Sequence, residues 1–115
     1  MTTLYGIKNC DTVKKARRWL DEHAVAYRFH DFRADGVDKQ RLTRWTKQVG
    51  WETLLNRRGT TWRGLPETAR NKIDDGTSAV TAMLAHPALI KRPVLEINGT
   101  VHVGFNAVDY ATLLN

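Results

Sequence analysis

The dipeptide Asn98-Gly99 is the feature that most restricts how this chain can fold. It separates two short segments rich in β-branched and apolar residues, Val94-Leu95-Glu96-Ile97 and Thr100-Val101-His102-Val103. Asn and Gly tolerate the positive φ angles of the two-residue turns whose twist matches that of paired strands. The sequence therefore predicts a tight antiparallel hairpin near the end of the chain.

The remaining pattern predicts an α/β fold in which this hairpin completes a mixed sheet. Val13, Ala16, Leu20 and Ala24 recur at helical spacing after a first strand. In order, we expect a strand at 2–7, a helix at about 12–24, a strand at 26–31, a mostly helical stretch at about 38–86, strands at 93–97 and 100–104, and a helix at 106–114 capped by Asn106. Within the helical stretch, Thr77 and Ser78 are expected to open the last helix.

The order of these elements is that of a thioredoxin-like fold. It reads β-α-β, then a helical insertion, then β-β-α, which predicts a four-stranded mixed sheet. The first two strands, joined through a helix, should be parallel, whereas the hairpin adds antiparallel strands. We expect one thioredoxin-like domain over 1–115, with the helical insertion at about 38–86 between its halves.

Composition excludes several classes of protein. The 115 residues hold no apolar run long enough to span a membrane. No secretory signal precedes the first strand, and a single cysteine excludes an internal disulfide. These features together predict a protein of the reducing cytoplasm.

The chain is basic, with 18 Lys and Arg residues against 12 Asp and Glu residues. A net charge of +6 is compatible with a nucleic acid, a small anionic substrate or a solvated basic surface. Neither an aromatic-interleaved RNA motif nor a helix-turn-helix pattern accompanies it, so we expect no nucleic acid partner. The four histidines lack metal-ligand spacing, and no metal site is predicted.

Cys10 is the candidate nucleophile because of where it stands. It follows the turn residues Lys8 and Asn9 and comes directly before a predicted helix. Unpaired N–H groups and the helix dipole stabilise an anion at such a position, and a cysteine there typically has a lowered pKa. Lys8, Lys14 and Lys15 add positive charge nearby. The alternative is that Cys10 is a small buried hydrophobic residue.

Arg92-Pro93 opens the third predicted strand. Bonds that precede proline can be cis at modest cost. In thioredoxin-like folds a cis proline at this place packs beside the active thiol, and the backbone of the preceding residue can pair with a peptide-like ligand. The strand order therefore favours a cis bond over an ordinary trans proline.

Two blocks of the chain form a specific pattern: Leu4-Tyr5-Gly6-Ile7-Lys8-Asn9-Cys10-Asp11-Thr12-Val13-Lys14-Lys15-Ala16 and His86-Pro87-Ala88-Leu89-Ile90-Lys91-Arg92-Pro93-Val94. They resemble a known family, the arsenate reductase ArsC/Spx family, and the first block is most similar to its YffB branch. The resemblance extends over essentially the whole chain. It implies the thioredoxin fold with a helical insertion, a reactive Cys10 and a cis Pro93.

The chain also departs from the family's pattern. Its arsenate reductases carry arginines in an "LLR" stretch, in "RP" and in a "CRP" stretch after the hairpin. Arg92 matches the second, but Asn56, followed by Arg57, stands at the first, and Gly104 stands at the third. Arsenate thus loses most of its charge-assisted donors, although Arg57 could replace one. The Cys-x-x-Cys switch of Spx regulators is incomplete, since Val13 replaces the second cysteine.

A single-thiol site needs an external thiol to resolve its mixed disulfide, and glutathione is the abundant cytosolic one. The sequence thus predicts a glutathione-dependent thiol-disulfide reductase with Cys10 catalytic and no bound cofactor, glutathione being co-substrate to an unknown disulfide or oxidised substrate. The substrate-binding candidates are Lys8, Asn9, Lys14, Arg57, Arg92 and Pro93. Two alternatives stay open: an arsenate reductase coupled to glutathione and glutaredoxin, and a Spx-like non-enzymatic regulator that binds RNA polymerase.

Overall fold

The computed structural model describes residues 1–114 and divides the chain into two compact units. One unit combines Met1–Gly36 with Arg92–Asn115, and the other consists of Val37–Lys91. The first holds all four strands, and the second is the helical insertion expected at about 38–86. Among the described residues, no helix is long and apolar enough to cross a membrane.

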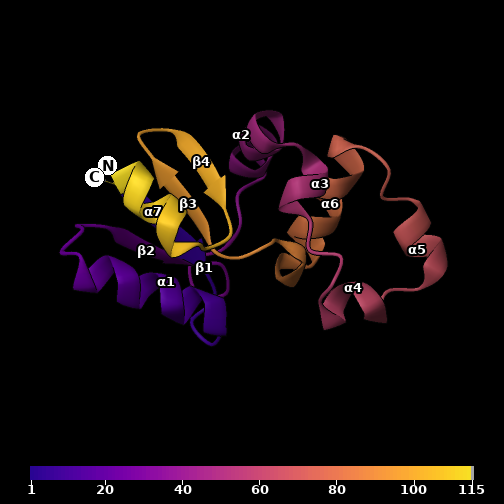
Figure 1. Ribbon diagram of the computed structural model, residues 1–115. Helices are drawn as coiled ribbons and strands as arrows, with labels where there is room; N and C mark the ends of the chain where they lie inside the picture. Colours follow the sequence, from indigo (N-terminus) through magenta and orange to yellow (C-terminus); the bar gives the residue numbers. More distant parts are fainter. Residues whose placement is uncertain (115) are drawn as a thin grey trace. The chain divides into compact units, whose positions relative to one another are not determined.

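The sheet has the predicted mixed arrangement (Figure 1). Its strands are β1 (Thr2–Gly6), β2 (Arg28–Asp31), β3 (Val94–Ile97) and β4 (Thr100–Val103), in the order β2-β1-β3-β4. β1 runs parallel to β2 and antiparallel to β3, and β3 pairs antiparallel with β4. The fold is therefore the thioredoxin-like α/β fold that the element order predicts.

The hairpin between β3 and β4 forms as expected. Asn98 has a φ of 49° and Gly99 a φ of 86°, the left-handed values that a turn of this length requires. The N–H of Asn98 also donates to the carbonyl of Met1, with 3.0 Å between nitrogen and oxygen. The register that follows places Val94 opposite Val103, so the start of β3 lies beside the end of β4.

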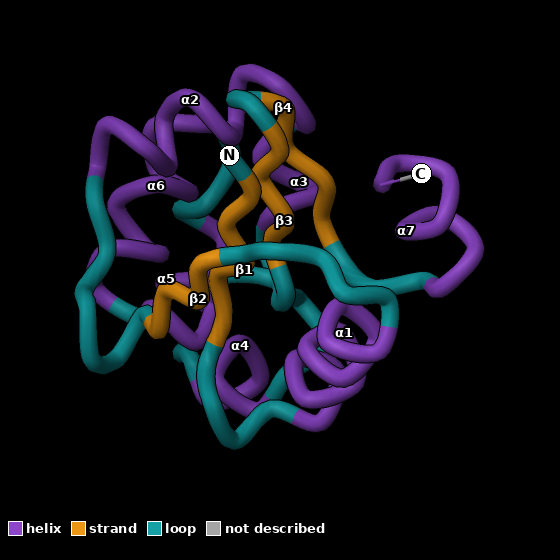
Figure 2. The backbone as a smooth tube through the Cα atoms, turned by 90° about the vertical axis from the view of Figure 1, so that its left-hand side faces the viewer, coloured by secondary structure: helices purple, strands orange, loops and turns teal. Residues whose placement is uncertain are grey.

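Two helices, α1 (Asp11–Glu22) and α7 (Ala107–Leu114), cover the same face of the sheet (Figure 2). The core between them and the sheet consists of buried residues from both helices, β1 and β3: Leu4, Ala16, Leu20, Leu95 and Tyr110. Burying a leucine-sized side chain contributes about 1.5–3 kcal/mol, so this cluster holds α1 firmly against β1. The Asn106 side chain caps α7 by accepting the N–H of Val108 at 2.9 Å.

The first helix and the second strand are shorter than predicted. Ala24, placed on the apolar face of the helix by its spacing, is exposed and has a φ of 54°. α1 has ended by then, and the N–H of Val25 donates to the carbonyl of Leu20 at 3.0 Å. Ala24 is itself the left-handed residue through which the chain leaves the helix, and this conformation turns it away from the core. β2 begins at Arg28, so Ala26 and Tyr27 lie outside it.

The helical unit contains α2 (Lys39–Val49), α3 (Trp51–Leu54), α4 (Thr60–Gly64), α5 (Glu67–Asn71), α6 (Gly76–Ala85) and a 3-10 turn at Pro87–Leu89. α2 packs against α6. The largest buried side chains of this unit include Leu42, Trp45, Leu54, Met83, Leu89 and Ile90. Gly50, with a φ of 87°, separates α2 from α3.

The start of α6 differs by one residue from the prediction. The helix begins at Gly76, and Asp75 is its N-cap. The Asp75 carboxylate accepts the N–H of Ser78 at 2.7 Å, while the Ser78 hydroxyl oxygen accepts the N–H of Asp75 at 3.1 Å. This reciprocal capping box satisfies two N–H groups that the helix leaves unpaired. The predicted start was one residue late because Thr77-Ser78 is itself a capping pattern.

Candidate active site

Cys10 occupies the N-cap position of α1, with a φ of −89° and a ψ of 125°. Its N–H donates to the carbonyl of Ile7 at 3.2 Å, which closes a turn through Lys8 and Asn9, and its own carbonyl accepts the N–H of Lys14 at 2.9 Å. N-caps are usually Ser, Thr, Asp or Asn, whose side-chain oxygen accepts a helix N–H. At Cys10 a sulfur atom takes the place of that oxygen, and it forms no regular capping hydrogen bond.

The environment of the half-buried Cys10 thiol favours its anionic form. Burial raises the pKa of Cys10, but the N–H of Val13, the guanidinium of Arg92 and the N–H of Thr12 together lower it more. Arg92 acts through both a hydrogen bond and its charge. The pKa of Cys10 is therefore lowered overall, and the thiolate is the nucleophilic form of cysteine.

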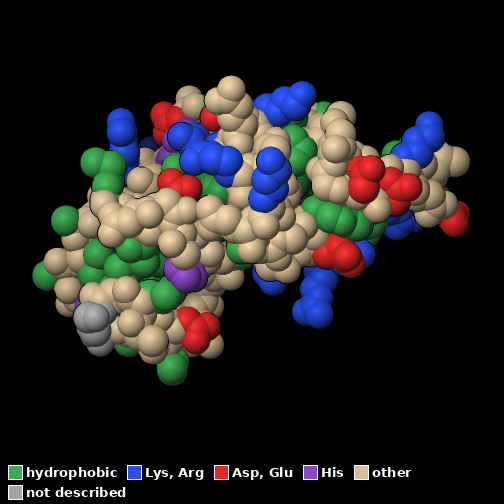
Figure 3. Space-filling model, turned by 90° about the horizontal axis from the view of Figure 1, so that it is seen from above, with side chains coloured by type: hydrophobic (Ala, Val, Ile, Leu, Met, Phe, Trp, Pro, Cys, Tyr) green, Lys and Arg blue, Asp and Glu red, His purple; other side chains and the backbone are tan. Residues whose placement is uncertain are grey.

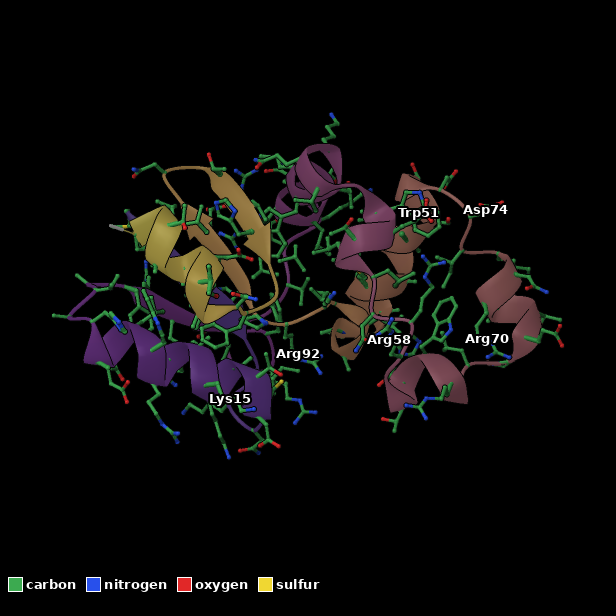
Figure 4. All side chains as sticks on the ribbon, viewed as in Figure 1. Lys15, Trp51, Arg58, Arg70, Asp74 and Arg92 are labelled. Atoms are coloured by element: carbon green, nitrogen blue, oxygen red, sulfur yellow. The ribbon has the colours of Figure 1, made fainter. Side chains whose placement is uncertain are left out.

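Arg92 reaches the thiol because the sheet brings two distant segments together. β3 begins just after Arg92, and Val94 pairs with Tyr5 near the end of β1, from which the chain passes into the Cys10 turn. Figure 4 shows Arg92 beside the amino-terminal end of α1. The Arg92-Pro93 peptide bond is cis, as predicted, and Pro93 is buried.

Gly6 allows α1 to start this close to the sheet. A Cβ atom at Gly6 would lie 2.6 Å from Cγ2 of Val13, nearer than two carbon atoms can approach. The absence of a side chain at the end of β1 lets the first turn of α1, which supplies the Val13 N–H, pack on the strand. The local sequence pattern places Gly6 only within a strand, because a close approach between distant segments leaves no local signal.

The other predicted residues of the Cys10 region are exposed on the surface. Lys8 and Asn9 form the turn, and Lys14 lies on the first part of α1, with Lys15 beside it. The charge that lowers the pKa of Cys10 is that of Arg92, whereas the charge of Lys8 acts on the buried carboxylate of Asp31. Sequence reasoning missed Asp31, since a carboxylate at a strand end is normally solvated.

Arg57 belongs to the helical unit, where it has local partners. Its Nη2 lies 3.4 Å from Oε2 of Glu52, and its guanidinium carbon lies 5.8 Å from the centre of the Trp51 ring. The ion pair is exposed and contributes little to stability. Figure 4 labels Trp51 together with Arg58, Arg70 and Asp74, which also belong to this unit.

Among the described residues, no group of three or more His, Cys, Asp or Glu side chains is arranged to hold a metal ion. The His23 ring stacks on Trp19 with 3.8 Å between ring centres, and the His30 ring bonds to the carbonyl of Gly36 at 2.9 Å. On the face seen in Figure 3, Lys and Arg side chains stand apart, with Asp and Glu side chains among them.

A lone thiol at a helix N-terminus, beside an arginine that precedes a cis proline, agrees with a family-model match over residues 5–113, described as the ArsC family. The chain belongs to the ArsC family. An uncharacterised protein of Haemophilus influenzae is 47% identical over 96% of both chains. A global transcriptional regulator Spx of Streptococcus agalactiae is 27% identical, with 99% of this chain and 83% of that protein aligned.

Solved structures agree with this placement. A YFFB protein is 53% identical and covers 100% of both chains with a TM-score of 0.96. A protein of Brucella melitensis related to arsenate reductase (ArsC) is 52% identical over 96% of this chain and 92% of its own, with a TM-score of 0.78. An arsenate reductase of Vibrio cholerae, at 18% identity over 98% of this chain and 97% of its own, shares the fold with a TM-score of 0.82.

Within the ArsC family, Asn56 and Gly104 are the positions at which this chain departs from the arginine pattern described above. The Asn56 side-chain oxygen accepts the N–H of Arg58 at 3.1 Å and so closes the turn after α3. Gly104 has a φ of 89°, and its N–H donates to the carbonyl of Pro93 at 2.8 Å. An arginine at Gly104 would need a backbone conformation that residues with a Cβ atom rarely adopt.

Proposed function

We propose that this ArsC-family chain is a glutathione-dependent thiol-disulfide reductase that acts through the thiolate of Cys10. The observation that supports this proposal most is the lowered pKa of Cys10, caused by the Val13 and Thr12 N–H groups and by Arg92 against the opposing effect of burial. Because the chain has a single cysteine, a second thiol must come from another molecule. Glutathione fills that role in the reducing cytoplasm, where we expect this protein to work.

The proposed reaction has two exchanges. In the first, the Cys10 thiolate attacks the glutathione sulfur of a mixed disulfide between glutathione and a substrate thiol. A Cys10–glutathione disulfide forms, and the substrate leaves as a thiolate that takes up a proton. In the second, the thiolate of another glutathione attacks the Cys10–glutathione disulfide. This step releases glutathione disulfide and restores the Cys10 thiolate, so the substrate disulfide is reduced while two glutathione molecules end up oxidised to one disulfide.

Arg92 is the proposed anchor for glutathione as well as the activator of the thiol. Once Cys10 is in a disulfide, its sulfur no longer carries the negative charge that Arg92 stabilised. The guanidinium can then exchange its contact with the sulfur for one with a glutathione carboxylate, and a hydrogen bond to a charged group contributes about 1.5–3 kcal/mol. Lys8, Asn9 and Lys14 are exposed around the same turn and are proposed as further contacts, whereas Arg57 is proposed from the sequence pattern alone.

Two other functions compete with this proposal. Arsenate reduction is the activity that the names of several structural neighbours carry, but Asn56 and Gly104 remove two arginines of the expected oxyanion site. A non-enzymatic regulatory role is suggested by the Spx relatives. Val13 stands three residues after Cys10, where Spx regulators have the second cysteine of their switch, so an intramolecular disulfide switch is impossible here.

Mass spectrometry of the purified protein after exposure to glutathione disulfide tests the proposal. We expect one glutathione adduct on Cys10, removed again by reduced glutathione. Cys10→Ser should abolish the exchange but retain reversible glutathione binding, measured by calorimetry or NMR. Arg92→Ala should weaken that binding more than about tenfold, whereas Arg18→Ala, which removes an exposed arginine from α1, should not.

The outcomes separate the candidate functions. An inert Cys10 would contradict the reductase proposal, and tight binding of RNA polymerase by the same sample would favour the regulator. Rapid arsenate turnover with glutathione and glutaredoxin would favour the arsenate reductase. If Arg92→Ala binds glutathione as well as the parent protein, the assignment of Arg92 to the ligand is wrong and only the thiol chemistry remains.

A further inference from the structure

Asp31, the last residue of β2, is the one buried charged side chain among the described residues, with 7% of its surface exposed. Burying a carboxylate is costly unless hydrogen bonds replace its lost water. Its Oδ1 accepts the N–H of Arg33 at 2.8 Å and, more weakly, that of Ala34 at 3.4 Å. Two of its partners therefore lie in the turn that directly follows β2.

The third partner is in a different segment. Asp31 pairs with Gly6 in the sheet, two residues before Lys8. Burial raises the pKa of the Asp31 carboxylate, but the N–H groups of Arg33, Ala34 and Lys8 and the charge of the Lys8 ammonium group lower it overall. Lys8 is the first residue of the turn that leads to Cys10, which the Cys10 N–H closes on Ile7. Just before this turn, the carbonyl of Gly6 accepts the N–H of Phe32 at 2.8 Å, so the residue after Asp31 is joined to the end of the strand that leads into the turn.

We propose that Asp31 is a positioning residue for the Cys10 nucleophile: its carboxylate anchors the Lys8-Asn9 turn to the end of β2 and so holds the thiol against the first turn of α1 and Arg92. Two of the three N–H partners would serve a turn after β2 alone, but the Lys8 bond has no part in that turn. It connects the carboxylate to the loop that carries the sulfur.

Stabilisation of the Cys10 thiolate depends on where the sulfur is held. The Val13 and Thr12 N–H groups and the Arg92 guanidinium stabilise a thiolate only if the sulfur is held within hydrogen-bond reach of them. The Lys8-Asn9 turn connects β1 to α1 and is exposed to solvent. Without Asp31, the Lys8 N–H would turn to water, and the backbone of the turn would lose this side-chain anchor.

The inference rests on the proposed function only in taking Cys10 as the reactive group, so it is tested without glutathione. The rate of alkylation by iodoacetamide is followed against pH, which gives the midpoint of Cys10 ionisation. We expect Asp31→Ala to raise this midpoint by about one pH unit, and so to slow alkylation below the midpoint about tenfold. The control is Asp75→Asn, which replaces another carboxylate that accepts a backbone N–H, that of Ser78. It should leave the midpoint of Cys10 ionisation unchanged.

A second pair of variants isolates the hydrogen bond itself and serves if Asp31→Ala does not fold. Lys8 is the second residue of the Ile7–Cys10 turn, a position that proline suits. Lys8→Pro removes both the N–H and the ammonium group, whereas Lys8→Ala removes only the ammonium group. We expect a higher midpoint for Lys8→Pro than for Lys8→Ala.

Equal midpoints in the Lys8 pair, or a folded Asp31→Ala variant with the parent midpoint, would overturn the inference and leave Asp31 as the cap of its own turn. If the midpoints shift as expected but no glutathione adduct ever forms on Cys10, the positioning role stands and the reductase proposal fails.

Discussion

Removing the Arg92 guanidinium should raise the pKa of Cys10, and the size of the change follows from its two contributions. Arg92 donates a hydrogen bond to the sulfur and acts on it through its charge. A hydrogen bond to a charged group is worth about 1.5–3 kcal/mol. At about 1.36 kcal/mol for each pKa unit, this corresponds to about one to two units. Because both residues are only half-buried, solvent screening favours the lower end, about one unit.

The assay is the ultraviolet absorbance of the thiolate, recorded against pH for the parent protein and for Arg92→Ala. Burial still raises the pKa of Cys10 in the variant, while the Val13 and Thr12 N–H groups still lower it. Lys15→Ala is the matched control, because it removes one exposed positive charge from the same end of α1. An unchanged midpoint in Arg92→Ala, or an equal rise in Lys15→Ala, would refute the assignment of Arg92 as the activating cation.

The same pKa makes stability depend on pH. The folded protein holds the pKa of Cys10 below its unfolded value of about 8.5. The unfolded state therefore binds more protons between the two pKa values, and the free energy of unfolding rises with pH across that window. This stabilisation is fully present above about pH 8.5 and is lost as the pH falls through the folded pKa. Cys10→Ser should abolish this part of the pH dependence, measured by chemical denaturation at several pH values. Arg92→Ala should narrow the pH range over which stability rises, because it brings the folded pKa of Cys10 closer to the unfolded one.

Three further predictions concern the fold and the rival activity. Gly6→Ala should lower the free energy of unfolding by about 1–3 kcal/mol in urea denaturation, since its Cβ would collide with Val13; the control Gly64→Ala, where a Cβ meets nothing, should not destabilise. Asp75→Ala should cost about 1 kcal/mol through loss of the α6 cap, and an unchanged denaturation midpoint would contradict the capping box. Arsenate turnover with glutathione and glutaredoxin should be weak or absent, because Asn56 and Gly104 replace arginines of the family pattern; turnover matching an authentic arsenate reductase would show that another cation completes the site.

The elements of the fold could be predicted because their signals are local. The Asn98-Gly99 turn and the alternation around it reflect backbone preferences of a few residues, and they place β3 and β4 to within a residue. The errors arose where a long-range or competing contact decided the outcome. Ala24 continues the apolar spacing of α1, but the helix ends at Glu22 and Ala24 itself adopts a left-handed backbone conformation beyond it. At α6, two adjacent capping patterns compete, and Asp75 is the N-cap.

The candidate nucleophile, Cys10, was visible in the sequence for the same reason. A lone cysteine between a strand and a helix needs only local elements to place it at a helix N-terminus, where N–H groups are unpaired. Its cationic partner was less visible, since the sequence offered Lys8, Lys14, Lys15, Arg57 and Arg92 as candidates around the thiol.

The sequence by itself determined the elements, their order and the place of Cys10, because strand alternation, helical spacing and turn residues act over a few positions of the chain. Only the tertiary structure decided which charges act on which groups. The pairing of β3 with β1 brings Arg92 to the thiol across some eighty residues of chain, and the pairing of β2 with β1 brings the Asp31 carboxylate to Lys8. Hydrogen bonds and charge interactions depend on distances of a few ångströms, and sheet pairing between distant segments sets those distances.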